Sequence, residues 1–140
     1  MSLDAEYVQD AEYVQIEWLD QKIGIMRVYD APVTATQIAG GIPYIFFTVV
    51  QITEEGDALL KGALEFPMKA LKQIIRFARE NTDWDILRWE RPSVGYDVFL
   101  KIRENGVDGC KMIKKFYDMA ADQDCQKEYT GAEQVMLSVA

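Results

Sequence analysis

The sequence predicts one α+β domain with a mostly antiparallel sheet of about five to six strands and two main helices packed on one face. Strand-like runs are grouped before each helical run and do not alternate with helices one by one, which favours this class. The chain has 140 residues, of which 49% are hydrophobic and 27% charged, the size and balance of a single globular domain. No linker-like stretch divides it.

The first residues are treated separately from the domain. The segment Asp4–Gln9 is repeated without change as Asp10–Gln15, a repeat too short for a solenoid unit. Met1-Ser2-Leu3 is typical of an expression leader. We therefore expect residues 1–9 to be a leader or a disordered segment, and residues 10–140 to form the domain. A genuine duplication that lengthens the first strand is the alternative.

Four strands are expected before the first helix. Residues 13–29 alternate between the two faces around a turn at Asp20-Gln21, which predicts an antiparallel hairpin. An apolar connection over residues 31–43 follows. Residues 44–53 are then almost continuously apolar, which predicts a strand buried on both faces. A turn at residues 54–57 leads to a strand over residues 58–66.

Helical spacing occurs twice in the rest of the chain. Pro67 suits the first position of a helix, and apolar residues recur at helical spacing from Met68 to Ala78. Residues 84–90 and 95–103 alternate as strands. Asp108 is a candidate cap for a second helix, whose apolar stripe would be Cys110, Ile113, Phe116, Tyr117 and Ala120. The tail over residues 133–140 is expected to be an edge strand or a docked extension.

Composition argues against several kinds of function. The net charge of −8 disfavours nucleic acid as a partner, because phosphate neutralisation needs a basic surface. The longest apolar stretch, residues 42–50, is shorter than the roughly 20 residues that span a membrane. With no signal peptide and only Cys110 and Cys125, we expect reduced thiols and a cytoplasmic location. The absence of histidine removes the usual general base and the commonest metal ligand.

Basic residues on the first predicted helix form one candidate site. Lys69, Lys72, Arg76 and Arg79 recur at spacings of three and four, so they project from one side of that helix. Arg88 and Arg91 lie nearby in sequence. Such a patch could bind an anion or an acidic partner. The alternative is an ordinary solvated helix face.

Two further candidates involve the predicted sheet. A pocket between the 31–43 connection and the sheet would draw polar groups from Thr34, Thr36, Tyr44 and Tyr96, with Arg88 or Arg91 for an anionic group. Strand alternation predicts that Trp84 and Trp89 lie on opposite faces, as do Tyr96 and Phe99. Trp84, Trp89 and Phe99 are therefore candidates for an interface on the second face. Packing in the core is the alternative.

Metal binding and cysteine chemistry are weakly supported. The acidic residues Asp118, Asp122, Asp124 and Glu128 lack the ligand spacing of a calcium loop, so we predict no metal site and no cofactor. Cys110 is expected to be a buried thiol, because no histidine is available to activate it.

These observations favour a non-enzymatic, acidic protein-interaction module. Its partner would be another protein, such as a basic one, or a second copy of the chain, as in a homodimer. No residue is assigned a catalytic role, because nothing in the sequence resembles an activated nucleophile and its base. The alternative is a small-molecule-binding domain or a carboxylate-based enzyme, with its pocket between the 31–43 connection and the sheet.

Overall fold

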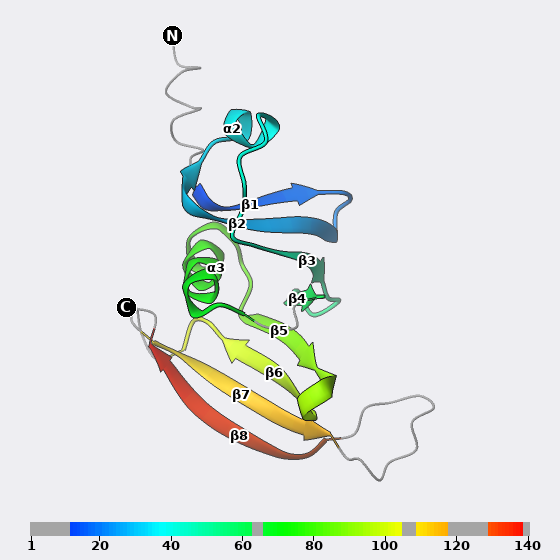
Figure 1. Cartoon of the computed structure of the whole chain (residues 1–140). Coiled ribbons are helices and arrows are strands. Elements are labelled where there is room, and N and C mark those ends of the chain that lie inside the picture. The colour runs from blue at the N-terminus through cyan, green and yellow to red at the C-terminus, as the bar shows by residue number, and fades with distance from the viewer. Residues whose placement is uncertain (1–11, 63–65, 105–108, 118–128, 139–140) are drawn as a thin grey trace.

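The computed structural model describes residues 12–62, 66–104, 109–117 and 129–138. Within these ranges eight strands form a single sheet, and their order in space follows the chain from β1 to β8 (Figure 1). Neighbouring strands are antiparallel except β4 and β5, which run parallel because helix α3 carries the chain from one to the other. The α+β class is confirmed, although the sheet is larger than expected.

The first two strands form the expected hairpin. β1 covers Glu12–Trp18 and β2 covers Ile23–Val33, and they pair in antiparallel register. Asp20 shapes the turn, because its Oδ1 accepts hydrogen bonds from the backbone N–H groups of Lys22 and Ile23, each at 2.7 Å. Residues 1–9, expected to be a leader, lie outside the described residues.

A short helix, α2 (Ala35–Ala39), interrupts the connection that follows. Thr34 begins it with a capping box: its hydroxyl accepts from the Gln37 N–H, and the Gln37 side chain accepts from the Thr34 N–H. This reciprocal pair satisfies N–H groups that a free helix start would leave unbonded. In Figure 1, α2 lies on the opposite side of β1 and β2 from α3.

Strands β3 (Phe46–Ile52) and β4 (Ala58–Lys61) continue the sheet. The expectation that this third strand is buried on both faces is wrong. Val50 is buried, whereas Phe47 on the other face is 52% exposed. Helix α3 covers one face only, so the apolar residues of β3 that point the other way stay partly in solvent. We call the face of the sheet opposite α3 the open face.

Helix α3 (Met68–Asn81) lies in the curve of the sheet and forms the core with it (Figure 1). The predicted spacing is confirmed, since the buried residues of α3 are Ala70, Leu71, Ile74, Ile75 and Ala78. Met68, at the first turn, is 49% exposed. Pro67 directly precedes the helix as its N-cap residue.

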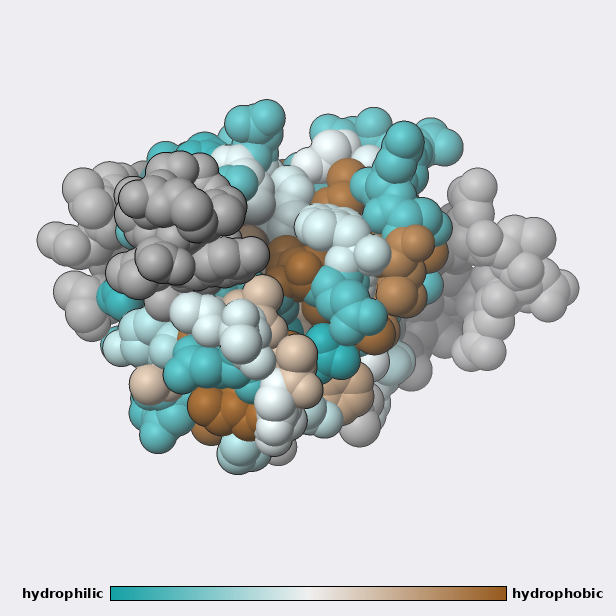
Figure 2. All heavy atoms as spheres, turned by 90° about the horizontal axis from the view of Figure 1, so that it is seen from above, coloured by the Kyte–Doolittle hydropathy of each residue, from teal (hydrophilic) through white to brown (hydrophobic). Residues whose placement is uncertain are grey.

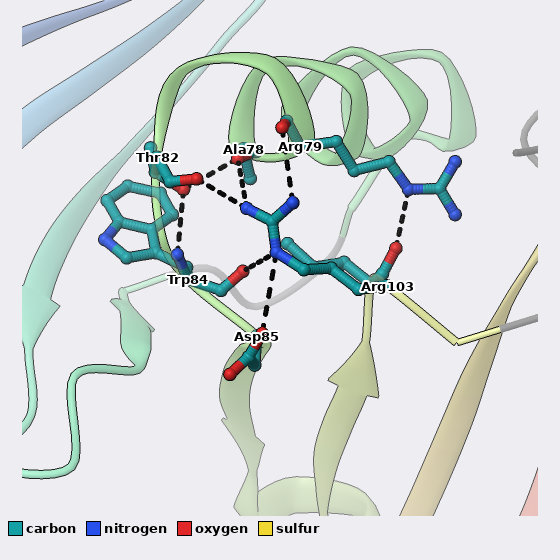
Figure 3. Close-up of polar contacts among 7 residues, drawn as sticks. Ala78, Arg79, Thr82, Trp84, Asp85 and Arg103 are labelled. Carbon is teal, nitrogen blue, oxygen red and sulfur yellow. Dashed lines mark hydrogen bonds and ion pairs between the residues drawn. The ribbon is translucent and has the colours of Figure 1, made fainter. Parts of the chain in front are cut away.

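The C-terminal end of α3 is held by an arginine from beyond the sixth strand (Figure 3). The guanidinium of Arg103 donates hydrogen bonds to four backbone carbonyl oxygens, those of Trp84 (3.0 Å), Arg79 (3.3 Å), Ala78 (3.3 Å) and Thr82. The last carbonyls of a helix have no partner within it, and a cation there also opposes the negative end of the helix dipole. One side chain therefore both caps α3 and fixes the segment that leads to β5.

The second half of the sheet consists of β5 (Ile86–Arg91), β6 (Tyr96–Lys101), β7 (Gly109–Tyr117) and β8 (Tyr129–Ser138), with a 3-10 turn at Pro92–Val94 after β5. The tail expected to be an edge strand or an extension is an edge strand. Together these strands extend the sheet well past the helix (Figure 1).

The prediction of a second helix is wrong over the residues that the structure describes, because Gly109–Tyr117 is strand β7. Cys110, Met112 and Phe116 share one face of this strand, whereas Ile113 and Tyr117 of the predicted helical stripe lie on the other. Pairing with β6 and with β8 stabilises the strand, because a central strand satisfies its backbone groups on both sides. The expectation of two main helices packed on one face is therefore wrong as well.

Candidate functional site

Strand β8 forms one edge of the sheet (Figure 1). It is 10 residues long, and among the described strands it pairs with β7 alone. Residues 130–136 are all exposed, including Val135 at 39% and Met136 at 59%. A strand in this position presents unpaired backbone N–H and C=O groups, which can pair with an incoming strand.

A buried polar cluster ties this edge strand to the interior of the sheet. Asp97 in β6 is 0% exposed. Its Oδ1 accepts a hydrogen bond from the Tyr117 hydroxyl, and its Oδ2 accepts one from the Tyr129 hydroxyl at 2.7 Å. Because Tyr129 begins β8, the second bond reaches across β7 to β6. A buried carboxylate is tolerated only when its oxygens are hydrogen-bonded, so these contacts stabilise the position of β8.

The two phenols in this cluster stay protonated at neutral pH. Burial, and then the hydrogen bond to Asp97, raise the pKa of Tyr129 to about 12. The same causes raise the pKa of Tyr117. A general base needs a pKa near the working pH. The cluster therefore acts as a structural tie, and neither phenol is poised to accept a proton.

Phe99 lies on the open face between two cations. The Arg88 guanidinium carbon is 4.8 Å from the ring centroid, and the Lys115 Nζ is 4.4 Å from it. Tyr129 meets the same ring edge-on, with centroids 6.1 Å apart. Each of the two cation–π contacts stabilises the ring by about 0.5–2 kcal/mol. Phe99, a predicted interface residue, is thus half-buried under basic side chains of the same sheet.

A shallow hollow lies on the open face at the other end of the sheet, between β2 and the segment that contains α2. Its volume is about 490 Å³, and its lining includes Arg27, Tyr29, Ile38 and Tyr44. Arg27 is held by Glu17 at 3.1 Å. Figure 2 views the molecule from this end and shows hydrophobic surface set among hydrophilic side chains. This is where the predicted pocket between the 31–43 connection and the sheet would lie.

The predicted pocket residues are only partly brought together. Tyr44 lines the hollow, whereas Thr34 caps α2 and Thr36 is exposed within it. Tyr96 packs against the core on the α3 side of the sheet, where its hydroxyl accepts a hydrogen bond from Arg91 Nη1 at 3.1 Å. The sheet therefore separates Tyr96 and Arg91 from the hollow.

The basic residues of α3 do not form one uniform patch. Arg79 turns back to the sheet, where its Nε donates to the carbonyl of Ile102 at 2.6 Å. Lys69 forms an ion pair with Asp30, Lys72 is half-buried, and Arg76 is exposed. Arg79 thus stabilises the packing of α3, and Arg88 lies on the opposite face of the sheet.

The two candidate interface tryptophans lie in the core. Trp89 is 4% exposed and Trp84 is 7% exposed, and both belong to the same buried cluster. The expectation that they face opposite ways is wrong, because β5 begins at Ile86 and Trp84 precedes it. Neither side chain is available to a partner in this fold. Tyr96 and Phe99 do lie on opposite faces, as their spacing within β6 predicts.

Sequence reasoning missed the Asp97 cluster and gave β8 little weight. Asp97, Tyr117 and Tyr129 are distant in the chain, and no local pattern links them. A signal for β8 was present, since Glu133 is the only charged residue in Tyr129–Ser138. Such a run is unusual at an exposed edge, because natural edge strands are commonly protected by charges or proline.

Cys110 is buried in β7, and burial raises the pKa of its thiol. Within the described ranges, no cluster of three or more carboxylate and thiol side chains is placed to hold a metal ion. The predicted acidic group at residues 118–128 lies outside them. None of the described helices combines the length and the apolar composition needed to cross a membrane. Comparison of the chain with models of known families, with curated proteins and with solved structures gives no match.

Proposed function

We propose that this protein is a non-enzymatic interaction module that binds an extended strand of a protein partner along the edge of β8. The observation that carries the proposal is the exposed, nearly uncharged edge of this strand. Peptide strands that join a sheet edge gain affinity from main-chain hydrogen bonds and specificity from alternate side chains. β8 offers both kinds of contact over 10 residues.

The anchoring of β8 supports this role. A flexible edge would lose conformational entropy when a partner strand bound to it. β8 is instead held in a nine-pair register with β7 and by the hydroxyl of Tyr129 on Asp97. The edge is therefore ordered before a partner arrives, and the cost of binding is reduced.

The side chains of β8 add apolar contact beside the backbone groups. Val135 and Met136 are both exposed and point to opposite faces of the sheet. An added strand would cover part of each. Burial of apolar surface contributes roughly 25 cal/mol per Å², so even partial cover supports the main-chain bonds.

The experiment is selection of strand-forming peptides from a random displayed library, followed by affinity measurements on two matched variants. Val135→Lys/Met136→Lys places two cations on the β8 edge. Trp18→Lys/Leu19→Lys makes the same charge change at residues that are 45% and 61% exposed, at the far end of the sheet. We expect selected peptides to lose binding to the first variant and to keep it with the second. Equal binding to both, with both variants folded by circular dichroism, would refute the proposal.

The hollow beside α2 supports a second candidate function, which is binding of a small molecule with an aromatic or apolar body. Tyr29 and Tyr44 line it, and Arg27 supplies a cation at its edge. Ligand pockets in proteins commonly combine apolar walls with a few polar groups, and their usual volumes of about 300–1,000 Å³ include this one. A thermal-shift screen of small aromatic acids on the wild type and on Ile38→Trp, which would fill the hollow, tests it. A ligand that stabilises both proteins equally does not bind there.

A further inference from the structure

We propose that the strand bound by β8 is β8 of a second copy of this chain, antiparallel, with Gln134 on the two-fold axis. This inference rests on the function proposed above and names its partner. The central observation is that the symmetry of such a pair restricts the register. Of the two registers that pair most of β8 with its copy, one places like charges opposite each other. The other pairs side chains of complementary size and polarity.

The two-fold axis of an antiparallel edge pair is perpendicular to the sheet. Residues directly opposite each other must point to the same side of the joined sheet. Side chains alternate along β8 from Gly131 to Ser138, beyond the register shift at the start of the strand. Each of these residues can therefore face only residues an even number of positions away, and one residue must face its own copy. The two registers that use most of Tyr129–Ser138 are centred on Glu133 and on Gln134.

Charge selects between these two registers. Centring on Glu133 would place two carboxylates directly opposite each other, with Cβ atoms about 4.5–5.5 Å apart, and like charges in that position are destabilising. Centring on Gln134 places two amides there, each with a donor and an acceptor for the other. In this register Glu133 faces Val135 of the second copy, while Lys114 of its own β7 is its cross-strand neighbour in either register.

The flanking pairs of the Gln134 register are complementary in size and polarity. Met136 faces Ala132 and Leu137 faces Gly131, each across to the other copy. Thr130 is left out of this comparison, because the register of β8 with β7 shifts between Gly131 and Tyr129. Large side chains thus meet small ones across the interface. The α3 helices of both copies lie on the same side of the joined sheet. An interface limited to one edge strand is small, so we expect a reversible dimer that forms with rising protein concentration.

Cysteine crosslinking tests the register in the full chain with Cys125→Ser, which leaves only the buried Cys110. Gln134→Cys places two thiols directly opposite each other, at the Cα separation of about 4.5–5.5 Å that a disulfide requires. Thr130→Cys is the matched control, because its two introduced thiols would lie eight residues apart along the joined strands, about 26 Å. We expect mild oxidation to shift Gln134→Cys to covalent dimer and to leave Thr130→Cys monomeric. Ala132→Cys/Met136→Cys, whose positions face each other in this register, should crosslink as well.

Equal dimer from Gln134→Cys and Thr130→Cys would overturn the register. Light scattering gives an independent reading. The wild type should gain mass with concentration. Gln134→Lys, which places two cations directly opposite each other in this register, should stay monomeric, while Trp18→Lys/Leu19→Lys behaves as the wild type. If the wild type stays monomeric and its selected peptides still require an intact β8 edge, the self-pairing proposal is refuted and binding of a partner strand is supported. If the wild type stays monomeric and the peptides also bind Val135→Lys/Met136→Lys with unchanged affinity, both proposals are refuted.

Discussion

Replacement of Arg103 by alanine should lower the unfolding free energy more than alanine replacement of Arg76 or Arg79, the two arginines of α3. Arg103 donates to four carbonyl oxygens and lies 3.5 Å from the Asp85 carboxylate (Figure 3). Its side chain is 38% exposed, so the bonds are partly shielded from water. The alanine variant would leave the last carbonyls of α3 without this partner.

The expected loss of unfolding free energy is about 2–3 kcal/mol. Hydrogen bonds that involve a charged group contribute about 1.5–3 kcal/mol each when well buried, but bonds from one half-exposed side chain do not add fully. Asp85 is 77% exposed, so its ion pair adds about 0.5 kcal/mol or less. At this chain length, the loss corresponds to roughly 8–12 °C in Tm.

The assay is urea unfolding followed by circular dichroism and by tryptophan fluorescence, since Trp84 lies beside the cap. Arg76→Ala, an exposed change on the same helix, is the control and should fall within about 0.5 kcal/mol of the wild type. Arg103→Lys keeps the charge but lacks the planar fork, so it should recover only part of the loss. If Arg103→Ala matches Arg76→Ala, the cap does not stabilise α3 as argued.

Three other perturbations test the remaining features of the fold. Asp97→Ala removes the acceptor of two half-buried phenol hydroxyls and should lower the unfolding free energy by about 2–4 kcal/mol in urea titrations. A neutral result would mean that β8 does not depend on the cluster. The pKa of Tyr129 is raised from 10.0 to about 12, so its contribution is fully present below pH 10 and is lost as pH rises toward 12. Thermal melts should therefore decline over this window, and less steeply for Tyr129→Phe; parallel curves would contradict the assignment. Gly24→Ala would place a Cβ 2.8 Å from Ile16 Cγ2. This overpacking should lower the unfolding free energy by about 1–3 kcal/mol in the same urea titration. An unchanged midpoint would show that β1 can shift to accommodate the methyl group.

The elements that were predicted correctly are those whose signal is local. The spacing of apolar residues in α3, with Pro67 before it, is sufficient to place a helix there because its buried stripe is contained in 14 residues. The β1–β2 hairpin likewise follows from alternation on both sides of a turn at Asp20. In both cases, neighbours in the chain are also neighbours in the fold.

The candidate site was predicted much less well. Thr34, Thr36 and Tyr44 lie in or near the segment beside the hollow, as expected, but Tyr96 and Arg91 lie across the sheet from it. Position along a strand determines which residues share a face, and it leaves open which element covers that face. The 31–43 connection folds over the open face and α3 covers the other, so residues expected in one pocket are divided between two sides.

The sequence is sufficient to predict the class of fold, helix α3, the first hairpin and an overall acidic chain without imidazole. The strand state of residues 109–117 and the contact of Asp97 with two tyrosines depend on tertiary structure. Cys110, Ile113 and Phe116 recur at helical spacing and predicted a helix, but pairing with β6 and β8 makes this segment a strand. Local periodicity is set by adjacent residues, whereas a central strand and a buried carboxylate depend on hydrogen bonds from residues distant in the chain.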